Sequence, residues 1–274
     1  MGVKQIEKHL GTRGSGITMA DEMKDGFYDP VERAASIEAS VCKDELRKYY
    51  RFRPARFYGG IATADCLGCC LRCLFCWSWD NVVKADQRGE FRSPEQVARK
   101  LVAIARKRGF QQVRISGNEP TIGKKHLIGV LEALPRDLLF ILETNGILIG
   151  YDKSYAEELA HFENLYVRIS LKGATEQEFV ALTGAKSEGF SLQLRALENL
   201  HVAGVNTQPA VMVSFSTPES LSSLGKRLGR ISKRFENFET EELVLYGDVE
   251  DRLRAAKIAF AVAHRPECVP AEQI

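Results

Sequence analysis

The sequence lacks the features that would tie the protein to a membrane or to nucleic acid. The longest aliphatic run, residues 138–142, is far too short to cross a bilayer. The N-terminus has no apolar segment of the signal-peptide type, and Ile6 spoils a myristoylation signal. The formal net charge is only +2, so no global charge excess points to nucleic acid or to a membrane surface. We therefore expect a cytoplasmic protein with no membrane partner.

Internal repeats and low-complexity stretches are also missing, and the composition is that of an ordinary globular enzyme. Of the 274 residues, 45% are hydrophobic and 27% are charged. A chain of this length can form one large domain with a substantial core, or two small domains. Five of the seven cysteines lie within one short run, which would be hazardous in an oxidising compartment. This cysteine usage favours a reducing cytosol.

The most informative segment is that run, which reads Cys66-Leu-Gly-Cys69-Cys70-Leu-Arg-Cys73-Leu-Phe-Cys76. One set within it has C-x3-C-x2-C spacing, namely Cys69, Cys73 and Cys76. Three thiolates in one short loop can ligate three irons of a [4Fe–4S] cluster. The fourth iron is then free to bind a substrate or cofactor, and an open coordination position separates a chemical metal site from a closed structural one. The run therefore points to chemistry.

A second register has the same spacing and uses Cys66, Cys70 and Cys73. The residue before its last cysteine is Arg72, whereas Phe75 precedes the last cysteine of the first register. An aromatic ring in that position can pack against a flat cofactor ring beside the cluster. We therefore favour the first register.

Two other kinds of metal site were weighed for the same run. A bacterial ferredoxin run would continue with a cysteine at the fourth position after Cys76, where this sequence has Asp80. Structural zinc would use two C-x2-C pairs, but only three residues separate the pairs here, against a dozen or more in most zinc sites. Both sites are disfavoured, and an electron-transfer iron–sulfur protein stays as an alternative from another functional class.

The N-terminal part predicts an extension that contains a single helix. Residues 1–27 are polar, punctuated by glycine and without a clear period. Asp29-Pro30-Val31-Glu32 is typical of a helix start, and we expect that helix to run to about Tyr49. We therefore divide the chain into an extension, residues 1–50, and a barrel domain, residues 51–274. A strand around 57–63 leads into the cysteine run, and a capped helix opens at Ser93-Pro94.

Strands and helices then alternate along the chain. The sequence predicts strands at 112–116, 138–142, 165–171, 210–215 and 243–246, and helices at 124–134, 155–162, 190–203, 220–235 and 249–262. With the strand before the cysteines this makes about six βα units, and such alternation is typical of a parallel sheet with right-handed crossovers. The predicted fold class is α/β, a partial (β/α)6 TIM-type barrel with an N-terminal helical extension.

Polar residues follow the predicted strands where each one ends, which is the face on which barrel enzymes carry their chemistry. The five strand ends read Ser116-Gly117-Asn118-Glu119-Pro120-Thr121, Glu143-Thr144-Asn145-Gly146, Ser170-Leu171-Lys172-Gly173, Ser214-Phe215-Ser216 and Tyr246-Gly247-Asp248. Any one of them alone would be read as a turn. Their occurrence in order, after an iron–sulfur run, favours function.

Over residues 55–250 the chain resembles the radical S-adenosylmethionine (radical SAM) enzymes. In that family the open iron binds the amino and carboxylate groups of S-adenosylmethionine, and one electron cleaves it to methionine and a 5′-deoxyadenosyl radical. The resemblance implies three ligands and one aromatic contact to the adenine: Cys69, Cys73, Cys76 and Phe75. It also implies that the methionine amino group is held by Gly117, Asn118 and Glu119, with Asn118 in place of the family's second glycine.

Within the superfamily the motifs are similar to those of glycyl-radical-enzyme activases of the pyruvate formate-lyase activating type. This likeness implies that Glu143 and Thr144 lie near the cofactor or a cation, and that the cofactor is contacted by Ser170, Lys172 and Ser214. A lysine is a point cation that suits the methionine carboxylate. The activases carry Asp-Gly-Pro-Gly ahead of their cysteines, whereas this chain reads Tyr58-Gly-Gly-Ile-Ala-Thr-Ala-Asp65, so a partner protein is not strongly implied.

We expect a radical SAM enzyme that uses a [4Fe–4S] cluster and S-adenosylmethionine and receives electrons from a donor such as flavodoxin or ferredoxin. Its unknown substrate could be a small molecule, a nucleoside or a protein glycine, and the last would make it an activase. We favour a small or nucleoside-sized substrate, because residues 1–50 could close the barrel mouth as a lid. No catalytic base is assigned, since the histidines show no partner pattern.

Overall fold

The structure is a computed structural model that describes residues 27–270, so residues 1–26 of the predicted extension 1–50 lie outside the described residues. Its centre is one sheet with the strand order β1-β2-β3-β5-β6-β7-β8-β9, and β4 pairs with β2. The strands are β1 Cys42–Lys43, β2 Leu46–Ala55, β3 Ile61–Cys66, β4 Glu90–Arg92, β5 Gln112–Ser116, β6 Leu139–Thr144, β7 Leu165–Leu171, β8 Thr207–Met212 and β9 Glu239–Glu241.

The helices are α2 Pro30–Val41, α3 Trp79–Val83, α4 Pro94–Arg108, α5 Lys124–Ala133, α6 Ile147–Tyr151, α7 Lys153–Leu159, α8 Glu176–Thr183, α9 Glu188–Val202, α10 Pro218–Ile231 and α11 Val249–Ala255. Short 3-10 turns are η1 Phe57–Gly59, η2 Pro120–Ile122, η3 Lys233–Glu236 and η4 Pro266–Cys268. None of the helices in the described part of the chain is long and apolar enough to cross a membrane.

Six strands, β3 and β5 to β9, pair in parallel in chain order. The sheet stays open, because its described edge strands β1 and β9 do not pair with each other. This confirms the predicted α/β fold with a partial barrel. Parallel pairing places every strand's carboxyl end at the same rim of the sheet, so the predicted polar strand ends after β5, β6, β7 and β8 share that rim.

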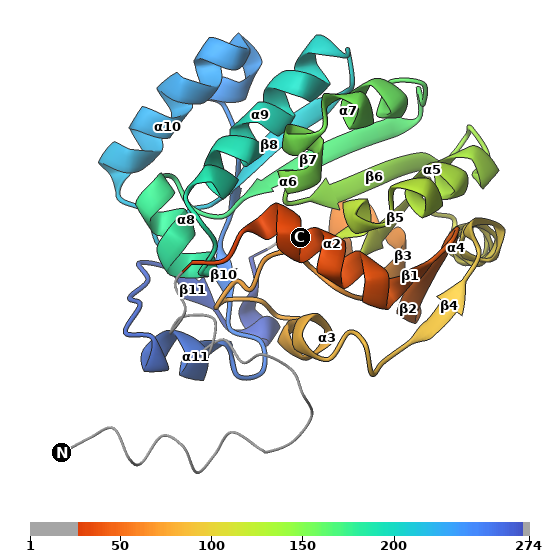
Figure 1. Cartoon of the computed structure of the whole chain (residues 1–274), viewed down its shortest axis with the longest axis horizontal. Helices are drawn as coiled ribbons and strands as arrows, with labels where there is room; N and C mark the ends of the chain where they lie inside the picture. Colours follow the sequence, from red (N-terminus) through yellow and green to blue (C-terminus); the bar gives the residue numbers. More distant parts are fainter. Residues whose placement is uncertain (1–26, 271–274) are drawn as a thin grey trace.

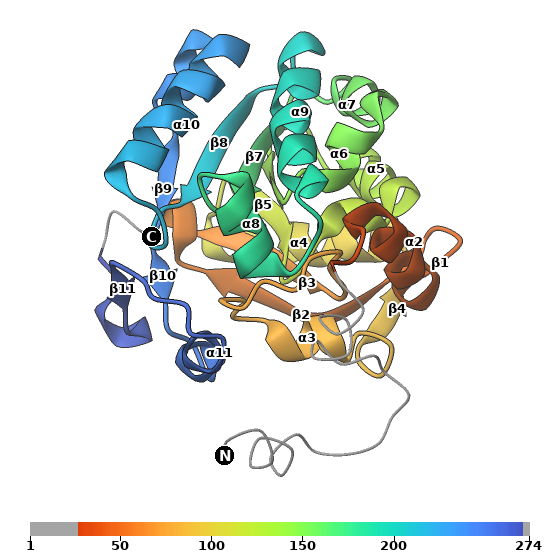
Figure 2. The same ribbon diagram turned by 60° about the vertical axis from the view of Figure 1, so that its left-hand side comes forward.

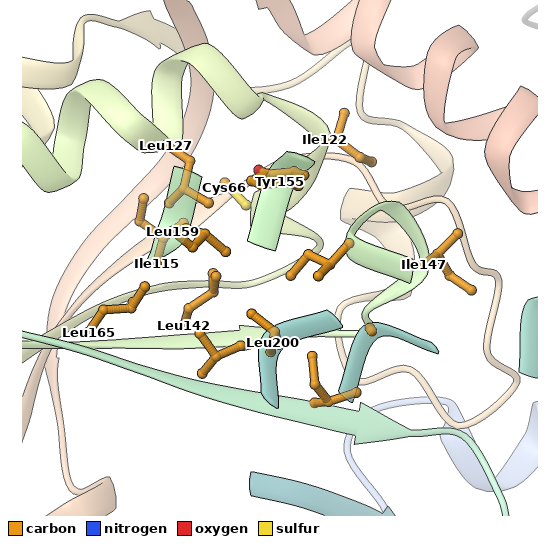
Figure 3. Close-up of a cluster of buried hydrophobic side chains, with 14 of the residues drawn as sticks. Cys66, Ile115, Ile122, Leu127, Leu142, Ile147, Tyr155, Leu159, Leu165 and Leu200 are labelled. Atoms are coloured by element: carbon orange, nitrogen blue, oxygen red, sulfur yellow. The ribbon is translucent and has the colours of Figure 1, made fainter. Parts of the chain in front are cut away.

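Helices cover the outer face of the sheet and bury its apolar side chains (Figure 1). Alternate residues of the parallel strands enter this layer, among them Ile115, Leu142 and Val167, all of them buried. Figure 3 shows part of this core, in which Cys66 lies among leucine and isoleucine side chains. Each fully buried side chain of this size contributes roughly 1.5–3 kcal/mol from removal of its apolar surface from water. The strands whose ends form the rim are therefore fixed by a well-packed hydrophobic core.

The N-terminal helix is shorter than the sequence predicted. Asp29 caps it as expected, since its carboxylate accepts hydrogen bonds from the backbone N–H of Val31 at 2.8 Å and of Glu32 at 3.3 Å. The helix ends at Val41 instead of Tyr49, because residues 46–55 form β2 and pair antiparallel with β3. The predicted boundary at residue 50 falls inside this strand.

Other strand and helix limits differ from the prediction as well. The strand expected at 57–63 is β3, Ile61–Cys66, and it follows a 3-10 turn in which Tyr58 has a φ of 56°. The sixth parallel strand is β9, whereas the segment expected there, 243–246, supplies β10 (Leu243–Val244), which pairs with β11 (Ala263–His264) in a separate small sheet. The last predicted helix stops at Ala255 instead of Val262.

The small sheet and α11 form a C-terminal unit with its own core, and Figure 2 shows these elements grouped to one side of the main sheet. That core consists of Leu74, Met212, Leu243, Val249 and Leu253. Since Leu74 belongs to the cysteine run, the C-terminal unit packs directly against the loop that carries the cysteines.

Candidate active site

The cysteine loop leaves β3 at the carboxyl rim and is tied to the loop that follows β5. The backbone N–H of Gly68 donates to Asn118 Oδ1 at 2.9 Å, and the N–H of Glu119 donates to the Gly68 carbonyl at 3.0 Å. Farther along, the N–H of Arg72 donates to the Tyr28 hydroxyl at 2.9 Å. These bonds hold the loop across the rim from several directions.

Two of the five cysteines in the run are turned into the protein. The sulfur of Cys66 is fully buried and lies 3.6 Å from Nη2 of Arg47. The sulfur of Cys70 is also buried and lies 3.3 Å from Nδ2 of Asn145. The same Nδ2 of Asn145 lies 3.7 Å from the sulfur of Cys69, so Cys66 has a partner of its own whereas Cys70 shares one with Cys69.

The other three cysteines, Cys69, Cys73 and Cys76, act on one another electrostatically. Burial raises the pKa of Cys76 to about 11 and raises that of Cys73, and the charge of Cys69 adds to both shifts. A hydrogen bond with the Cys70 thiol lowers the pKa of Cys69. The charge of Lys172 lowers the pKa of all three thiols. Lys172 is therefore the cation whose charge acts on all three thiols, and Arg252 also lowers the pKa of Cys76.

This donor set fits an iron–sulfur cluster. Between residues 27 and 270, no three His, Cys, Asp or Glu side chains gather around one point as they would for a single metal ion. A cubane cluster has a different requirement, since each cysteine sulfur binds a separate iron. Thiols whose pKa is raised by burial become ligands when the metal stabilises their thiolate form. The three thiols are thus the type of ligand that such a cluster takes.

The loop after β5 needs a glycine at its first turn. Gly117 has a φ of 93°, and a Cβ atom there would lie 3.0 Å from Asp65 Cβ and from the carbonyl oxygen of Cys66. The next residue, Asn118, uses its side chain to join two loops, since its Nδ2 also donates to Ser78 Oγ at 3.1 Å. Asn118 therefore does more than replace a glycine, because it fixes the cysteine loop against β5.

Glu119 is the junction of two strand-end loops. Its side chain is buried, and Oε1 accepts hydrogen bonds from the Thr121 N–H at 3.1 Å, Thr121 Oγ1 at 2.7 Å and Thr144 Oγ1 at 2.6 Å. Its Oε2 accepts from the Asn145 N–H at 2.8 Å. Oε1 thus accepts three of these hydrogen bonds and Oε2 accepts one. Glu119 therefore joins the loop after β5 to the loop after β6, through Thr144 and Asn145.

Ser170 and Lys172 lie together at the end of β7. Nζ of Lys172 donates to Ser170 Oγ at 2.5 Å, and Ser170 Oγ donates to Glu241 Oε2 at 2.7 Å. Glu143 lies on the inner face, where it accepts from Tyr58 at 2.5 Å and from Arg114 at 2.8 Å. The lysine is the cation among these residues whose charge reaches the three cysteines.

Ser214 and Phe75 lie at the junction with the C-terminal unit. The Ser214 hydroxyl is buried and accepts a hydrogen bond from the Leu243 N–H at 2.8 Å, so this side chain holds β10 in place. The ring of Phe75 is half-buried and packs against Phe215, with 5.4 Å between the ring centroids. An aromatic surface thus lies directly beside Cys76, as the preferred register required.

Sequence reasoning missed Arg252, although it contacts the cysteine loop more directly than several predicted residues. Its Nε donates to the carbonyl oxygen of Leu74 at 3.0 Å, and its Nη2 donates to that of Cys76 at 2.6 Å. The guanidinium also lies over the Trp79 ring, 4.9 Å from its centroid. No local pattern marks this arginine, because 176 residues separate it from Cys76.

The chain belongs to the radical SAM superfamily, because residues 66–225 match the family model described as "Radical SAM superfamily". That region begins within the cysteine run and includes the loops after β5, β6 and β7. Members of the superfamily are enzymes that use a [4Fe–4S] cluster and S-adenosylmethionine, so both predicted cofactors are confirmed at the level of the family.

Among named relatives, a GTP 3',8-cyclase from Thermodesulfovibrio yellowstonii is 30% identical over 120 residues, which cover 42% of this chain and 35% of that protein. A pyruvate formate-lyase-activating enzyme from Clostridium pasteurianum is 27% identical and is matched over 65% of this chain and 72% of its own length. The match thus spans about a third of the cyclase but most of the activating enzyme. The chain is therefore similar to an activating enzyme, as predicted, and also to GTP 3',8-cyclases.

Solved structures support the fold. The structure of Streptococcus suis SuiB bound to S-adenosylmethionine gives a TM-score of 0.50 at 16% identity, over 75% of this chain and 52% of that chain. SuiB bound to the precursor peptide SuiA gives the same score at 17% identity, over 72% and 46%. At this level of identity the likeness concerns the arrangement of strands and helices.

Proposed function

We propose that this chain reductively cleaves S-adenosylmethionine and that its cluster ligands are Cys69, Cys73 and Cys76. The observation that carries the proposal is the division among the five cysteines of the run. The charge of Lys172 acts on these three thiols, whereas Cys66 contacts Arg47 and Cys70 is fully buried, although Cys70 shares its partner Asn145 with Cys69. The spacing and the electrostatics of the structure therefore favour the same register.

The residues around the three cysteines suit the two ends of S-adenosylmethionine. Lys172 supplies a positive charge for the methionine carboxylate, and the turn at Gly117 and Asn118 brings backbone groups close enough for the amino group. Phe75 offers an aromatic face for the adenine. A [4Fe–4S] cluster held by Cys69, Cys73 and Cys76 would supply the electron for reductive cleavage of S-adenosylmethionine, and thereby the means to remove a hydrogen atom from the substrate.

For the substrate, we favour a small or nucleoside-sized molecule over a protein glycine. The GTP 3',8-cyclase relatives support the first and the activating enzyme supports the second. The Asp-Gly-Pro-Gly element of the activases is missing ahead of the cysteines, which argues for the first. The lid role of the N-terminal segment stays a prediction, and its described helix α2 packs beside α6 and η2.

We also propose that a small redox protein, such as flavodoxin or ferredoxin, donates the electron in the cytoplasm. Trp77, the residue after Cys76, is 46% exposed. An exposed aromatic side chain next to a cluster ligand supports a short path from a docked donor to the cluster.

Anaerobic reconstitution with iron and sulfide, followed by reduction, tests the proposal. We expect the electron paramagnetic resonance spectrum of the reduced cluster to change when S-adenosylmethionine is added, and dithionite to release 5′-deoxyadenosine slowly. An unchanged spectrum together with no 5′-deoxyadenosine would reject the proposed reaction. An electron-transfer protein, the alternative from another class, would hold a cluster but give neither response.

A further inference from the structure

The inner face of the sheet is polar, although barrel interiors are usually filled with branched apolar side chains. Ile141, Ala210 and Met212 also alternate with the core positions, but most of the residues that do so are polar: Thr63 and Asp65 on β3, Arg114 on β5, Glu143 on β6, Arg168 and Ser170 on β7, and Glu239 and Glu241 on β9. They bond to one another across strands, as in the contact of Arg114 Nε with Thr63 Oγ1 at 3.1 Å. Such a surface is suited to a charged or strongly polar ligand.

Most charges on this face are balanced by partners of opposite sign. Arg114 pairs with Glu143 at 2.8 Å. Arg168 pairs with Glu239 at 2.6 Å and with Glu241, which also accepts from Ser170. Burial acts to raise the pKa of Glu241, but the charges of Arg168 and, to a smaller extent, Lys172 lower it. At this end of the face, cations and carboxylates are matched.

The β2–β3 edge is different, because two guanidinium groups share one carboxylate. Nε of Arg51 lies 2.6 Å and Nε of Arg53 lies 2.8 Å from Oδ2 of Asp65, and Nη2 of Arg53 also donates to Oδ1 at 3.3 Å. The Asp65 side chain is fully buried, so it is paired only from within the protein. One positive charge is therefore left over at this edge of the inner face.

The shared aspartate also orients that excess charge. Since Asp65 takes the Nε edge of Arg51, the two Nη groups of this arginine point elsewhere, and they make no hydrogen bond within residues 27–270. The Arg51 side chain is 44% exposed, so these donors are accessible. A guanidinium fork held in this way is preorganised for a carboxylate or a phosphate.

The arginine pair lies close to the loop that we assign to S-adenosylmethionine. Asp65 pairs in register with Ser116, and its Cβ lies 3.0 Å from the position of a Cβ on Gly117. A molecule anchored on the two arginines therefore extends along the inner face within reach of the cofactor loop.

We propose that the substrate carries an anionic group, a phosphate or a carboxylate, and that Arg51 and Arg53 bind this group. The inference rests on the proposed function, since it names the substrate class for that site. The two arginines determine which substrate binds, while the cofactor loop determines where the hydrogen atom is removed.

Binding of inorganic phosphate and of succinate to the reconstituted protein, with S-adenosylmethionine present, tests this inference by calorimetry. We expect saturable binding of at least one of the two anions, and a preference for one identifies the chemical source of the anionic group. In R51Q and in R53Q the affinity falls about tenfold or more, because one charge-assisted contact is lost. R106Q is the matched control, since Arg106 pairs with the single carboxylate of Asp137 on the surface and should bind like wild type.

Each single variant leaves Asp65 with one arginine, so the buried carboxylate keeps a partner and the fold is preserved. R51K and R53K keep the charge without the fork and should give intermediate affinities. The inference is overturned if wild type binds neither anion, or if R51Q and R53Q bind as tightly as R106Q. The inference is also overturned if these variants weaken the binding of S-adenosylmethionine but leave the binding of the anions unchanged. Failure of the proposed function is distinguishable, because it appears as an unchanged wild-type spectrum on cofactor addition.

Discussion

Nη2 of Arg47 lies 3.6 Å from the sulfur of Cys66, and the same nitrogen donates to the carbonyl oxygens of Leu67 at 3.1 Å and Glu119 at 2.7 Å. One buried guanidinium thus joins the start of the cysteine loop to the loop after β5. Burial raises the pKa of Cys66, and Arg47 only partly opposes that shift. Cys66 is therefore a structural thiol beside a structural cation.

The ligand register can be tested by single replacements in the cysteine run. C69A, C73A and C76A should each abolish the cluster, because three thiolates are needed to hold the cube. C66A and C70A should keep most of the iron, because their thiols are turned toward Arg47 and Asn145. The iron-to-protein ratio and the brown absorption band provide the measurement. Loss of iron in C66A with retention in C76A would show that the other register is correct.

Replacement of the residues assigned to the cofactor should separate cofactor binding from cluster binding. Glu119→Ala removes the junction of two loops and Lys172→Ala removes the cation near the cysteines. Both should weaken the effect of S-adenosylmethionine on the spectrum about tenfold or more while the iron content stays near that of wild type. Lys226→Ala, on the exposed face of α10, is the control. If S-adenosylmethionine changed the spectrum equally in all three variants, Glu119 and Lys172 would not contribute to cofactor binding.

Arg252 should stabilise the cluster by fixing the backbone of the cysteine loop. Arg252→Ala frees the carbonyl groups of Leu74 and Cys76. We expect iron to be lost to a chelator several-fold faster under anaerobic conditions, and the midpoint potential of the cluster to shift. Arg254→Ala on the same helix is the control, because that arginine is exposed and pairs only with Glu250 and Asp251. Identical chelation rates in the two variants would contradict the assigned role.

His126 should make the fold sensitive to mild acid. Its Nδ1 lies 2.7 Å from the Glu45 carbonyl oxygen, to which it donates, and its Nε2 accepts from the Tyr49 hydroxyl at 2.9 Å, so the ring is neutral. Burial lowers the pKa of His126 from 6.5 to about 4. Between these two values the unfolded chain binds a proton that the native state does not, so stability falls as the pH drops from about 6.5 to about 4.

The full effect of this histidine is about 3 kcal/mol, from the conversion of a pKa shift into free energy. Denaturant unfolding at pH 7 and pH 5 provides the measurement. Relative to wild type, His126→Gln should be less stable at pH 7 but lose less stability on going to pH 5. His161→Gln, at an exposed position, should follow wild type. Parallel pH dependence in wild type and His126→Gln would show that the buried ring is not responsible.

The sequence located five of the six parallel strands, because their outer faces carry apolar residues, but it missed β9 and placed β8 at 210–215 instead of Thr207–Met212. The limits of Gln112–Ser116 and Leu165–Leu171 were predicted to the residue, and Ser93 and Asp29 marked helix starts correctly. β2 was mistaken for the end of a helix, because a bulge between Tyr49 and Arg51 interrupts its alternation. Its inner positions are arginines, which a sequence pattern does not distinguish from a solvent-exposed helix face.

The candidate site was only partly predictable, for a physical reason. Spacing identifies cysteines that can share a cluster, but the direction of each side chain depends on distant partners such as Arg47 and Asn145. The buried junction at Glu119 depends on Thr144, which belongs to another strand end. The role of Arg252 could not be predicted from the sequence for the same reason. Its partners are backbone carbonyl groups, which every residue carries, so the residue types at those positions do not indicate the contact.

The contact between Arg252 and the cysteine loop also affects the order of events during biosynthesis. The cysteines are synthesised 176 residues before the arginine that fixes their backbone. Chains emerge from the ribosome at roughly 5–20 residues per second, so the loop waits for roughly ten seconds or more without this support. Delivery of iron and sulfide to the finished chain, after translation, is the sequence of events that this arrangement favours.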